Sequence, residues 1–147
     1  ISTEIRIDGN NSTSKLIEMI NKCKFKPQIR AIMLDGIALG GFNIVDIEKL
    51  YETTGVPVIV VIRRMPDFKK IKEVLKKLGK QSKYKLLKKA GEPAKINRIY
   101  VQFKGITLEK VKAILTISCT HSLIPEPIRV AHIIASGIKE GQSRGRA

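Results

Sequence analysis

The stretch that decides the fold reads Arg-Ala-Ile-Met-Leu-Asp-Gly (30–36), Ile-Ala-Leu-Gly-Gly-Phe (37–42), an amphipathic run, and then Gly-Val-Pro-Val-Ile-Val-Val-Ile-Arg-Arg (55–64). Two short apolar runs joined by a helix are typical of neighbouring buried parallel strands. The first run delivers Asp35 to its end and the second delivers Arg63. Because ligands of open α/β sheets bind beyond the carboxyl ends of the strands, this pattern predicts a site that holds an acid and a base.

Outward from this stretch, the apolar periodicity predicts alternating strands and helices. Strands are expected at 3–7, 29–34, 57–62 and 96–103, and helices at 13–25, 43–54, 67–78, 84–90, 107–119 and 127–138. Asn43 is expected to cap the second helix and Gly55 to end it. The side chains of the third helix that are expected to be buried are Ile71, Val74, Leu75 and Leu78. These units predict one α/β domain over residues 1–147, with right-handed crossovers between parallel strands.

The charge of the chain is strongly basic. Its formal net charge is +15, and between positions 67 and 95 eleven lysines stand against Asp67, Glu73 and Glu92. Such an excess is typical of proteins that bind a polyanion, most often nucleic acid. We therefore expect Arg64, Lys69 and Lys70 to contact nucleic acid. The alternative is a solvated lysine face without a ligand.

Several classes of protein are disfavoured by the sequence. The apolar runs are too short to span a membrane, and no phosphate-binding loop, nucleophile elbow or zinc pattern occurs. The cysteines, Cys23 and Cys119, match no metal spacing, which predicts a cytoplasmic protein with two buried thiols. One of the two histidines, His132, shares a helix face with Arg129, three residues earlier. The alternative to a functional role is an ordinary packed helix residue.

Five segments together carry a resemblance to a known family. They are Ile-Met-Leu-Asp-Gly (32–36), Gly-Gly-Phe-Asn (40–43), Thr-Gly-Val-Pro-Val-Ile-Val-Val-Ile-Arg (54–63), Ile-Pro-Glu-Pro-Ile-Arg-Val-Ala-His (124–132) and Ser-Arg-Gly-Arg-Ala (143–147). The whole chain resembles an archaeal family grouped with endonuclease V-like proteins. The resemblance implies a ribonuclease H-like three-layer α/β fold, with helices on both faces of the sheet and N-terminal strands ahead of Ile1. It also implies metal-dependent cleavage of a strand near deaminated bases, with DNA favoured over RNA.

The resemblance also implies roles for individual residues. Asp35 matches a metal-ligating aspartate of endonuclease V, and Arg63 falls where that protein has a functional lysine. Arg129 matches the arginine of the Pro-Glu-Pro segment, and His132 falls where endonuclease V has a metal-site aspartate. Asp35, Arg63 and His132 are therefore the expected catalytic residues, with Arg129 expected to contact nucleic acid.

The chain also departs from the family pattern. Gly41 stands near the place of a histidine of endonuclease V, and Asn11 stands where the archaeal family usually has an aspartate. The wedge that splits the duplex has no counterpart. An acidic Asp-Asp-Gly strand of the family would precede Ile1.

Phosphodiester hydrolysis needs a divalent cation that polarises the phosphate and activates water. Hard cations prefer oxygen ligands, so we expect magnesium or manganese at Asp35, with Asp8 and His132 as further ligands. The alternative for Asp35 is a turn or cap before Gly36, and Asp8 before Gly9 is a turn pair as well.

Two functions therefore follow from the sequence. The first is a metal-dependent endonuclease that acts on deaminated bases. The second is a non-catalytic nucleic-acid-binding module that has kept the fold and the basic surface. A homodimer is left open.

Overall fold

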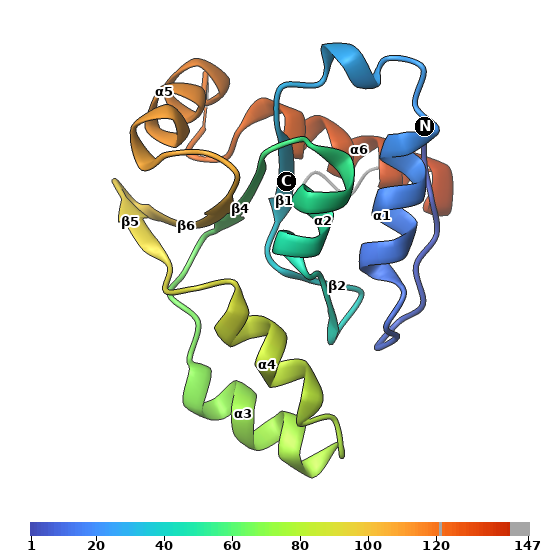
Figure 1. Cartoon of the computed structure of the whole chain (residues 1–147), viewed down its shortest axis with the longest axis vertical. Coiled ribbons are helices and arrows are strands. Elements are labelled where there is room, and N and C mark those ends of the chain that lie inside the picture. Colours follow the sequence, from blue (N-terminus) through green and yellow to red (C-terminus); the bar gives the residue numbers. More distant parts are fainter. Residues whose placement is uncertain (121, 142–147) are drawn as a thin grey trace.

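The computed structural model describes residues 1–120 and 122–141. Its helices are α1 (Ser12–Asn21), α2 (Ile47–Thr54), α3 (Phe68–Lys77), α4 (Ser82–Lys89), α5 (Leu108–Ser118) and α6 (Glu126–Glu140), with a 3-10 turn at Lys26–Gln28. Its strands are β1 (Ile32–Asp35), β2 (Ala38–Leu39), β3 (Asn43–Ile44), β4 (Val58–Ile62), β5 (Ala94–Ile96) and β6 (Ile99–Lys104). Figure 1 shows their arrangement.

The main sheet is mixed, with the strand order β1-β4-β6-β5. β1 and β4 are parallel, as the sequence predicted, and Asp35 pairs with Val61. β6 runs antiparallel to both β4 and β5. The expected single strand over 96–103 is therefore wrong, because the chain turns at Asn97, whose φ is +53°, and forms a hairpin. The α/β class is confirmed, whereas the ribonuclease H-like arrangement stays a prediction.

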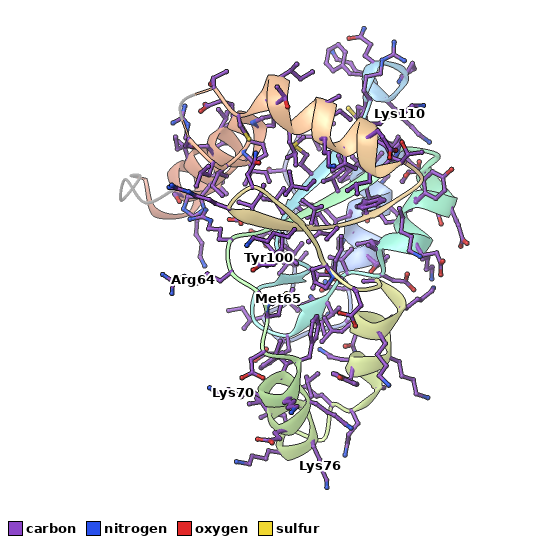
Figure 2. The ribbon with its side chains drawn as sticks, turned by 90° about the vertical axis from the view of Figure 1, so that its left-hand side faces the viewer. Arg64, Met65, Lys70, Lys76, Tyr100 and Lys110 are labelled. Atoms are coloured by element: carbon purple, nitrogen blue, oxygen red, sulfur yellow. The ribbon has the colours of Figure 1, made fainter. Side chains whose placement is uncertain are left out.

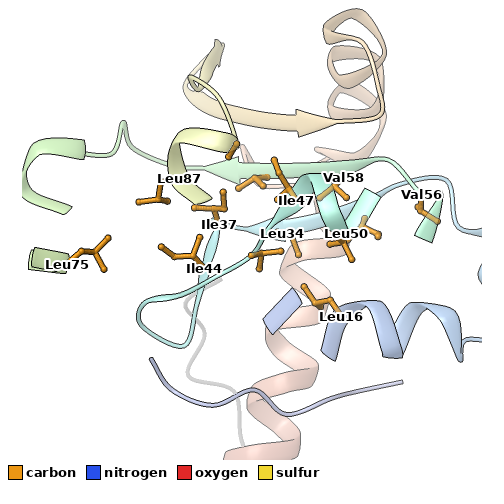
Figure 3. Close-up of a cluster of buried hydrophobic side chains, with 14 residues drawn as sticks. Leu16, Leu34, Ile37, Ile44, Ile47, Leu50, Val56, Val58, Leu75 and Leu87 are labelled. Carbon is orange, nitrogen blue, oxygen red and sulfur yellow. The ribbon is translucent and has the colours of Figure 1, made fainter. Parts of the chain in front are cut away.

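Alternate side chains of β4 enter two cores, one on each face of the sheet. Val58 and Val60 join a cluster with residues of α1, α2, α3 and α4 (Figure 3). Ile59 and Val61 join a second cluster with residues of α5 and α6. Helices therefore cover both faces of the sheet, as expected. Burial on both sides explains why this strand is a continuous apolar run.

Two predicted elements at the N-terminal end are wrong. Residues 3–7 form no strand, and the second helix begins at Ile47 with Asp46 as its cap rather than Asn43. Asn43 is buried, and its amide is satisfied there: the nitrogen donates to Arg6 O at 2.8 Å and the oxygen accepts from Ser12 N at 3.1 Å. This asparagine holds the N-terminal segment to the body of the protein.

The helices α3 and α4 form a hairpin that projects from the body, and we call residues 67–89 the basic arm (Figure 1). Leu75 is fully buried and Ile71 packs against the same core. Val74 and Leu78 were expected to be buried but are 39% and 50% exposed. A hairpin of two helices covers only one narrow stripe of each helix, so the flanking apolar residues stay in solvent.

One edge of the main sheet is open in the described part of the chain, because β1 pairs there with β4 alone. The helix α6 lies against β1, but most of its residues after Arg129 are exposed. The exposed apolar side chains of α6 are Val130, Ile133, Ile134 and Ile138. An apolar surface of this kind is unusual for a solvent-facing helix.

Two further expectations concern the thiols and the membrane. Cys23 and Cys119 are free, but each is half-buried rather than buried. Within residues 1–120 and 122–141, no helix is both long and apolar enough to cross a bilayer.

Candidate functional site at the ends of β1 and β4

The acid and the base predicted from the sequence meet at the carboxyl ends of β1 and β4. Arg63 Nη2 lies 3.3 Å from Asp35 Oδ2. The Asp35 side chain is 41% exposed and that of Arg63 is 48% exposed, so water reaches both groups. Exposed pairs of this kind add little to stability. The pair therefore contributes little to the stability of the fold.

The other two residues expected at this site lie on α6. His132 is exposed, and no hydrogen bond or ion pair joins it to another described residue. Arg129 is held by Glu126, whose Oε2 lies 2.7 Å from Arg129 Nη2 and 2.8 Å from Nε. The structure brings α6 against β1, but it records no direct bond between either α6 residue and Asp35. The roles of His132 and Arg129 stay predictions.

The structure places Asp8, expected as a metal ligand, against the glycine loop at 40–42. Its Oδ1 accepts a hydrogen bond from Phe42 N at 2.7 Å, and its own N donates to Gly40 O at 2.8 Å. The residue adopts a left-handed φ of +53°. Asn11 has a similar structural contact, because its Oδ1 accepts from Asn43 Nδ2 at 2.9 Å. Asp8 therefore holds the glycine loop at 40–42 in place, and Asn11 bonds to Asn43, directly after this loop.

The donor set of a divalent-metal site can be tested against these positions. Nowhere in the described ranges do three histidine, cysteine, aspartate or glutamate side chains come together as a group that could hold a metal ion. Asp35 offers one carboxylate, and a guanidinium already neighbours it. One carboxylate does not fit the several oxygen ligands that magnesium or manganese requires. The described residues therefore do not by themselves make a metal centre.

The basic arm carries the positive charge that the sequence predicted. Arg64, Lys70 and Lys76 point away from the body on the side shown in Figure 2. Lys69 is exposed, and Lys70 has only a loose contact, 3.7 Å from Asp67 Oδ2. The other exposed lysines of the arm without an ion pair to any described residue are Lys72, Lys76, Lys77, Lys85 and Lys88. The positive charges of these lysines are therefore largely uncompensated by nearby acidic side chains.

Lys83 is an arm residue whose role the sequence did not reveal. It is only 6% exposed, and its Nζ donates to Asp8 O at 2.8 Å, Gly9 O at 2.7 Å and Phe42 O at 2.7 Å. Burial lowers the pKa of its ammonium, and the nearby Lys80 lowers it further. Its three carbonyl partners lie far away in the sequence. Lys83 thus ties the arm to the N-terminal segment and to the glycine loop.

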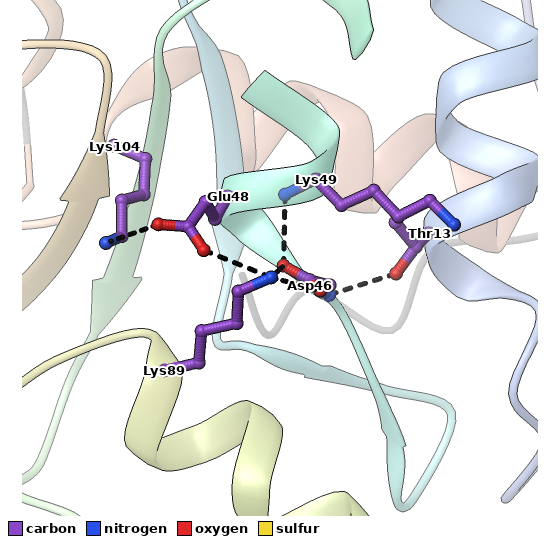
Figure 4. A network of polar contacts seen from close by, with 6 residues as sticks. All are labelled: Thr13, Asp46, Glu48, Lys49, Lys89 and Lys104. Atoms are coloured by element: carbon purple, nitrogen blue, oxygen red, sulfur yellow. Dashed lines mark hydrogen bonds and ion pairs between the residues drawn. The ribbon is translucent and has the colours of Figure 1, made fainter. Parts of the chain in front are cut away.

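A second lysine of α4 ties the arm to α2 (Figure 4). Lys89 Nζ lies 2.9 Å from Asp46 Oδ2 and 3.0 Å from Glu48 Oε2, and Lys104 Nζ lies 3.3 Å from Glu48 Oε1. Burial works to raise the pKa of Asp46, but the hydrogen bond from Lys49 N and the Lys89 contact outweigh it and lower the pKa. Lys89 and then Lys104 lower the pKa of Glu48.

Comparison with known proteins identifies the family. A family model described as "Endonuclease dU" matches residues 1–139, so the chain belongs to this family. A "UPF0215 protein" from Methanosarcina barkeri is 47% identical over 152 residues, covering 100% of this chain and 78% of the relative. One from Archaeoglobus fulgidus is 42% identical over 146 residues, covering 99% of this chain and 81% of the relative.

A solved structure of a related protein has the same fold as this chain. The crystal structure of a protein of unknown function from Archaeoglobus fulgidus matches with a TM-score of 0.88 at 42% identity. The match covers 92% of this chain and 79% of that chain. The family resemblance drawn from the five sequence segments is therefore confirmed, and the family name points to an endonuclease-like protein.

Proposed function

We propose that this protein binds nucleic acid through the basic arm and presents a strand to the Asp35–Arg63 end of the sheet. The observation that carries the proposal is the arm itself, where most lysines are exposed and have no acidic partner among the described residues. Phosphate contacts by lysine supply most of the sequence-independent affinity for nucleic acid. Arg64 directly follows Arg63 in the chain, and it points to the same side of the molecule as Lys70 of the arm (Figure 2).

A second candidate function is the endonuclease activity that the family name indicates. It is supported by the family match and by Asp35, a water-accessible carboxylate at the sheet edge where α/β proteins bind their ligands. Arg63, 3.3 Å from this carboxylate, would offset charge on a phosphate there. Deaminated bases in DNA are the proposed substrate, and magnesium or manganese is the proposed metal. Because the described residues offer too few ligands, cleavage needs donors beyond Asp35.

The binding proposal is tested by the salt dependence of affinity. The logarithm of the affinity for duplex DNA is expected to fall linearly with the logarithm of salt concentration, by about 0.9 for each phosphate neutralised. Replacing Lys69, Lys72, Lys76 and Lys77 by glutamine is expected to flatten the slope by several units, while Lys110 and Lys112 on α5 serve as controls. A flat response in the unmodified protein would mean that the lysines are only solvated.

The two candidates are separated by a nicking assay. Strands that contain inosine, uracil or an abasic site are incubated with manganese or magnesium, beside strands without a lesion. Metal-dependent nicking at the lesion supports the endonuclease. Salt-sensitive binding without nicking on any strand supports a binding module that retains the fold.

A further inference from the structure

A cavity of about 640 Å³ lies between the β5–β6 hairpin and α5, which are neighbours at one side of the molecule (Figure 1). Ile96, Ile99 and Leu115 line it, and all three are buried in the core that α5 shares with the sheet. The inner wall of the cavity is therefore apolar. Its volume falls within the range, roughly 300–1,000 Å³, of pockets that bind small organic molecules.

Three cationic residues line the same cavity, and no acidic residue does so among its described residues. They are Lys95 on β5, Arg98 in the hairpin turn and Lys112 on α5. All three are exposed, and none forms an ion pair with another described residue, so their long side chains can turn toward a ligand. Glu109 precedes Lys112 by one turn, but hydrogen bonds at its own backbone and to Thr107 lower its pKa more than the charge of Lys112 does.

The uncharged polar groups of the cavity do not offset these three positive charges. Burial raises the pKa of the Cys119 thiol, so this group stays protonated at neutral pH. Thr116 Oγ1 donates to Lys112 O at 2.9 Å, and Ser122 Oγ donates to Ile124 O at 2.9 Å. Both hydroxyl hydrogens are thus used within the protein, and the cationic side chains are the principal donors that a bound anion would meet.

A phosphate monoester matches this set of groups in charge and in shape. At neutral pH it carries a charge of about −1.5 to −2 and has three acceptor oxygens, which ammonium and guanidinium groups bind through strong charge-assisted hydrogen bonds. A phosphodiester inside a strand carries one charge and a sugar on either side, so it matches less well. The apolar inner wall suits the organic part of such a molecule.

We propose that this cavity binds a phosphate monoester with a small organic body, the phosphate lying among the three cations and the body against the apolar wall. The inference does not rest on the proposed function, because the cavity is distinct from both the basic arm and the Asp35–Arg63 pair. Two sources share this chemistry, a free organic phosphate and the phosphorylated end of a strand. The second is considered because Tyr100 pairs with Ile62, which brings the hairpin turn to the end of the sheet that carries Arg63.

The first test titrates isotope-labelled protein with thymidine monophosphate, with thymidine and with inorganic phosphate, at constant salt and pH. The backbone amide signals of Asn97 and Thr116, which line the cavity, are followed by NMR. Thymidine monophosphate is expected to saturate their shifts at a concentration about tenfold lower than either fragment, because it alone engages both the cations and the apolar wall. An equal response to thymidine would overturn recognition of the phosphate, and an equal response to inorganic phosphate would overturn a role for the apolar wall.

The second test reverses the charge of the cavity. Lys95→Glu combined with Arg98→Glu is expected to weaken thymidine monophosphate binding about tenfold or more. The matched control is Arg30→Glu combined with Lys110→Glu, which makes the same charge change at another cavity of about 650 Å³. The control should bind as the unmodified protein does. Equal weakening in both double variants, or none in the first, would contradict the assignment.

The third test fills the cavity without changing any charge. Thr116 is an exposed lining residue, and Thr116→Phe is expected to weaken binding of thymidine monophosphate by occupying the space for its organic body. Ile117→Phe, at the next position of α5, is the control because Ile117 is 77% exposed and does not line the cavity. Full affinity in a folded Thr116→Phe variant would overturn the inference.

The two sources are separated with short oligothymidylates that carry either a phosphate or a hydroxyl group at one end. A gain in affinity on phosphorylation that Lys95→Glu combined with Arg98→Glu removes identifies the strand end. Equal affinity of both strands, with thymidine monophosphate still bound, identifies a free organic phosphate. Strand binding that is insensitive to salt would contradict the proposed function alone, whereas failure to bind thymidine monophosphate would contradict this inference alone.

Discussion

Single residues hold this protein together at points where distant segments meet. The Lys83 ammonium sits among three carbonyl oxygens, from Asp8, Gly9 and Phe42. A buried charge is tolerated only when its hydrogen-bonding capacity is used, and here all three donors of the ammonium are used. Lys83 thus fixes this part of the chain through contacts between segments that are distant in the sequence, whereas a turn motif uses neighbouring residues.

Lys83→Met is expected to lower the free energy of unfolding by about 2 kcal/mol or more, because three partly buried carbonyls lose a charged donor. The measurement is denaturant unfolding followed by circular dichroism. Lys85→Met, at an exposed position of the same helix, is the control and is expected to be nearly neutral. Similar losses in both variants would mean that the carbonyl contacts contribute nothing specific.

Asp35→Asn is expected to remove lesion-directed nicking, if the protein shows it, and to leave the fold intact. Asparagine keeps the volume and the turn-forming ability of aspartate before Gly36, and the ion pair that it loses with Arg63 is exposed. The melting temperature should therefore change little. Nicking by the mutant at the full rate would exclude this carboxylate from the chemistry.

At the scale of elements, the basic arm is joined to the body by a pH-sensitive contact. Lys89 on α4 meets Asp46, which caps α2, and Glu48 in the first turn of that helix. Both carboxyl groups have pKa values below their ordinary values of 3.8 and 4.5. Their contribution to stability is therefore complete above about pH 4.5 and is lost as the pH falls through the lowered values.

Lys89→Met is expected to weaken this acid-side loss of stability, because the two carboxyl groups then return toward their ordinary pKa values. The slope of unfolding free energy between pH 5 and pH 2 should become shallower than in the unmodified protein. The pKa of Lys89 is raised by Asp46 and Glu48, so its own contribution is present at neutral pH and is lost only as the solution becomes strongly alkaline. An unchanged acid slope in the variant would show that the contact is not formed in solution.

At the scale of the whole molecule, the edge of β1 that is open in the described part of the chain lies beside the exposed apolar side of α6. A sheet edge offers unpaired backbone groups to any strand that approaches, and apolar helix residues beside it add to the attraction. The 147-residue chain is therefore expected to self-associate at high concentration. Ile134→Lys combined with Ile138→Lys should reduce this association in light scattering or sedimentation.

The control for that experiment is Ile117→Lys on α5, an exposed isoleucine away from β1. This variant should associate as the unmodified protein does. If the control reduces association equally, added charge alone is responsible and the α6 surface has no particular role.

The parts of the fold that the sequence predicts well are those set by neighbouring residues. β1 and β4 lie within the predicted apolar runs, and the helices predicted to begin at Asp67 and Thr107 start directly after these two residues, which cap them. The local pattern of side chains is enough to predict these elements. The hairpin β5–β6 was missed because its turn contains Asn97 without a glycine. Asn43 looked like a helix cap because only the folded chain brings Arg6 and Ser12 to its side chain.

The same distinction between local and long-range determinants applies to the candidate site. Asp35 and Arg63 could be predicted because both end parallel neighbouring strands. The contact of Lys83 could not be predicted, because its three carbonyl partners, on Asp8, Gly9 and Phe42, lie far away in the sequence.

The three-carbonyl contact of Lys83 also sets an order of events during synthesis. Asp8 emerges from the ribosome 75 residues ahead of Lys83. At 5–20 residues per second, this delay is roughly 4 to 15 seconds. The N-terminal segment lacks the Lys83 ammonium throughout that interval, and the glycine loop, made 41 residues ahead of Lys83, lacks it for about half as long. This corner of the protein is therefore completed only after α4 has been translated.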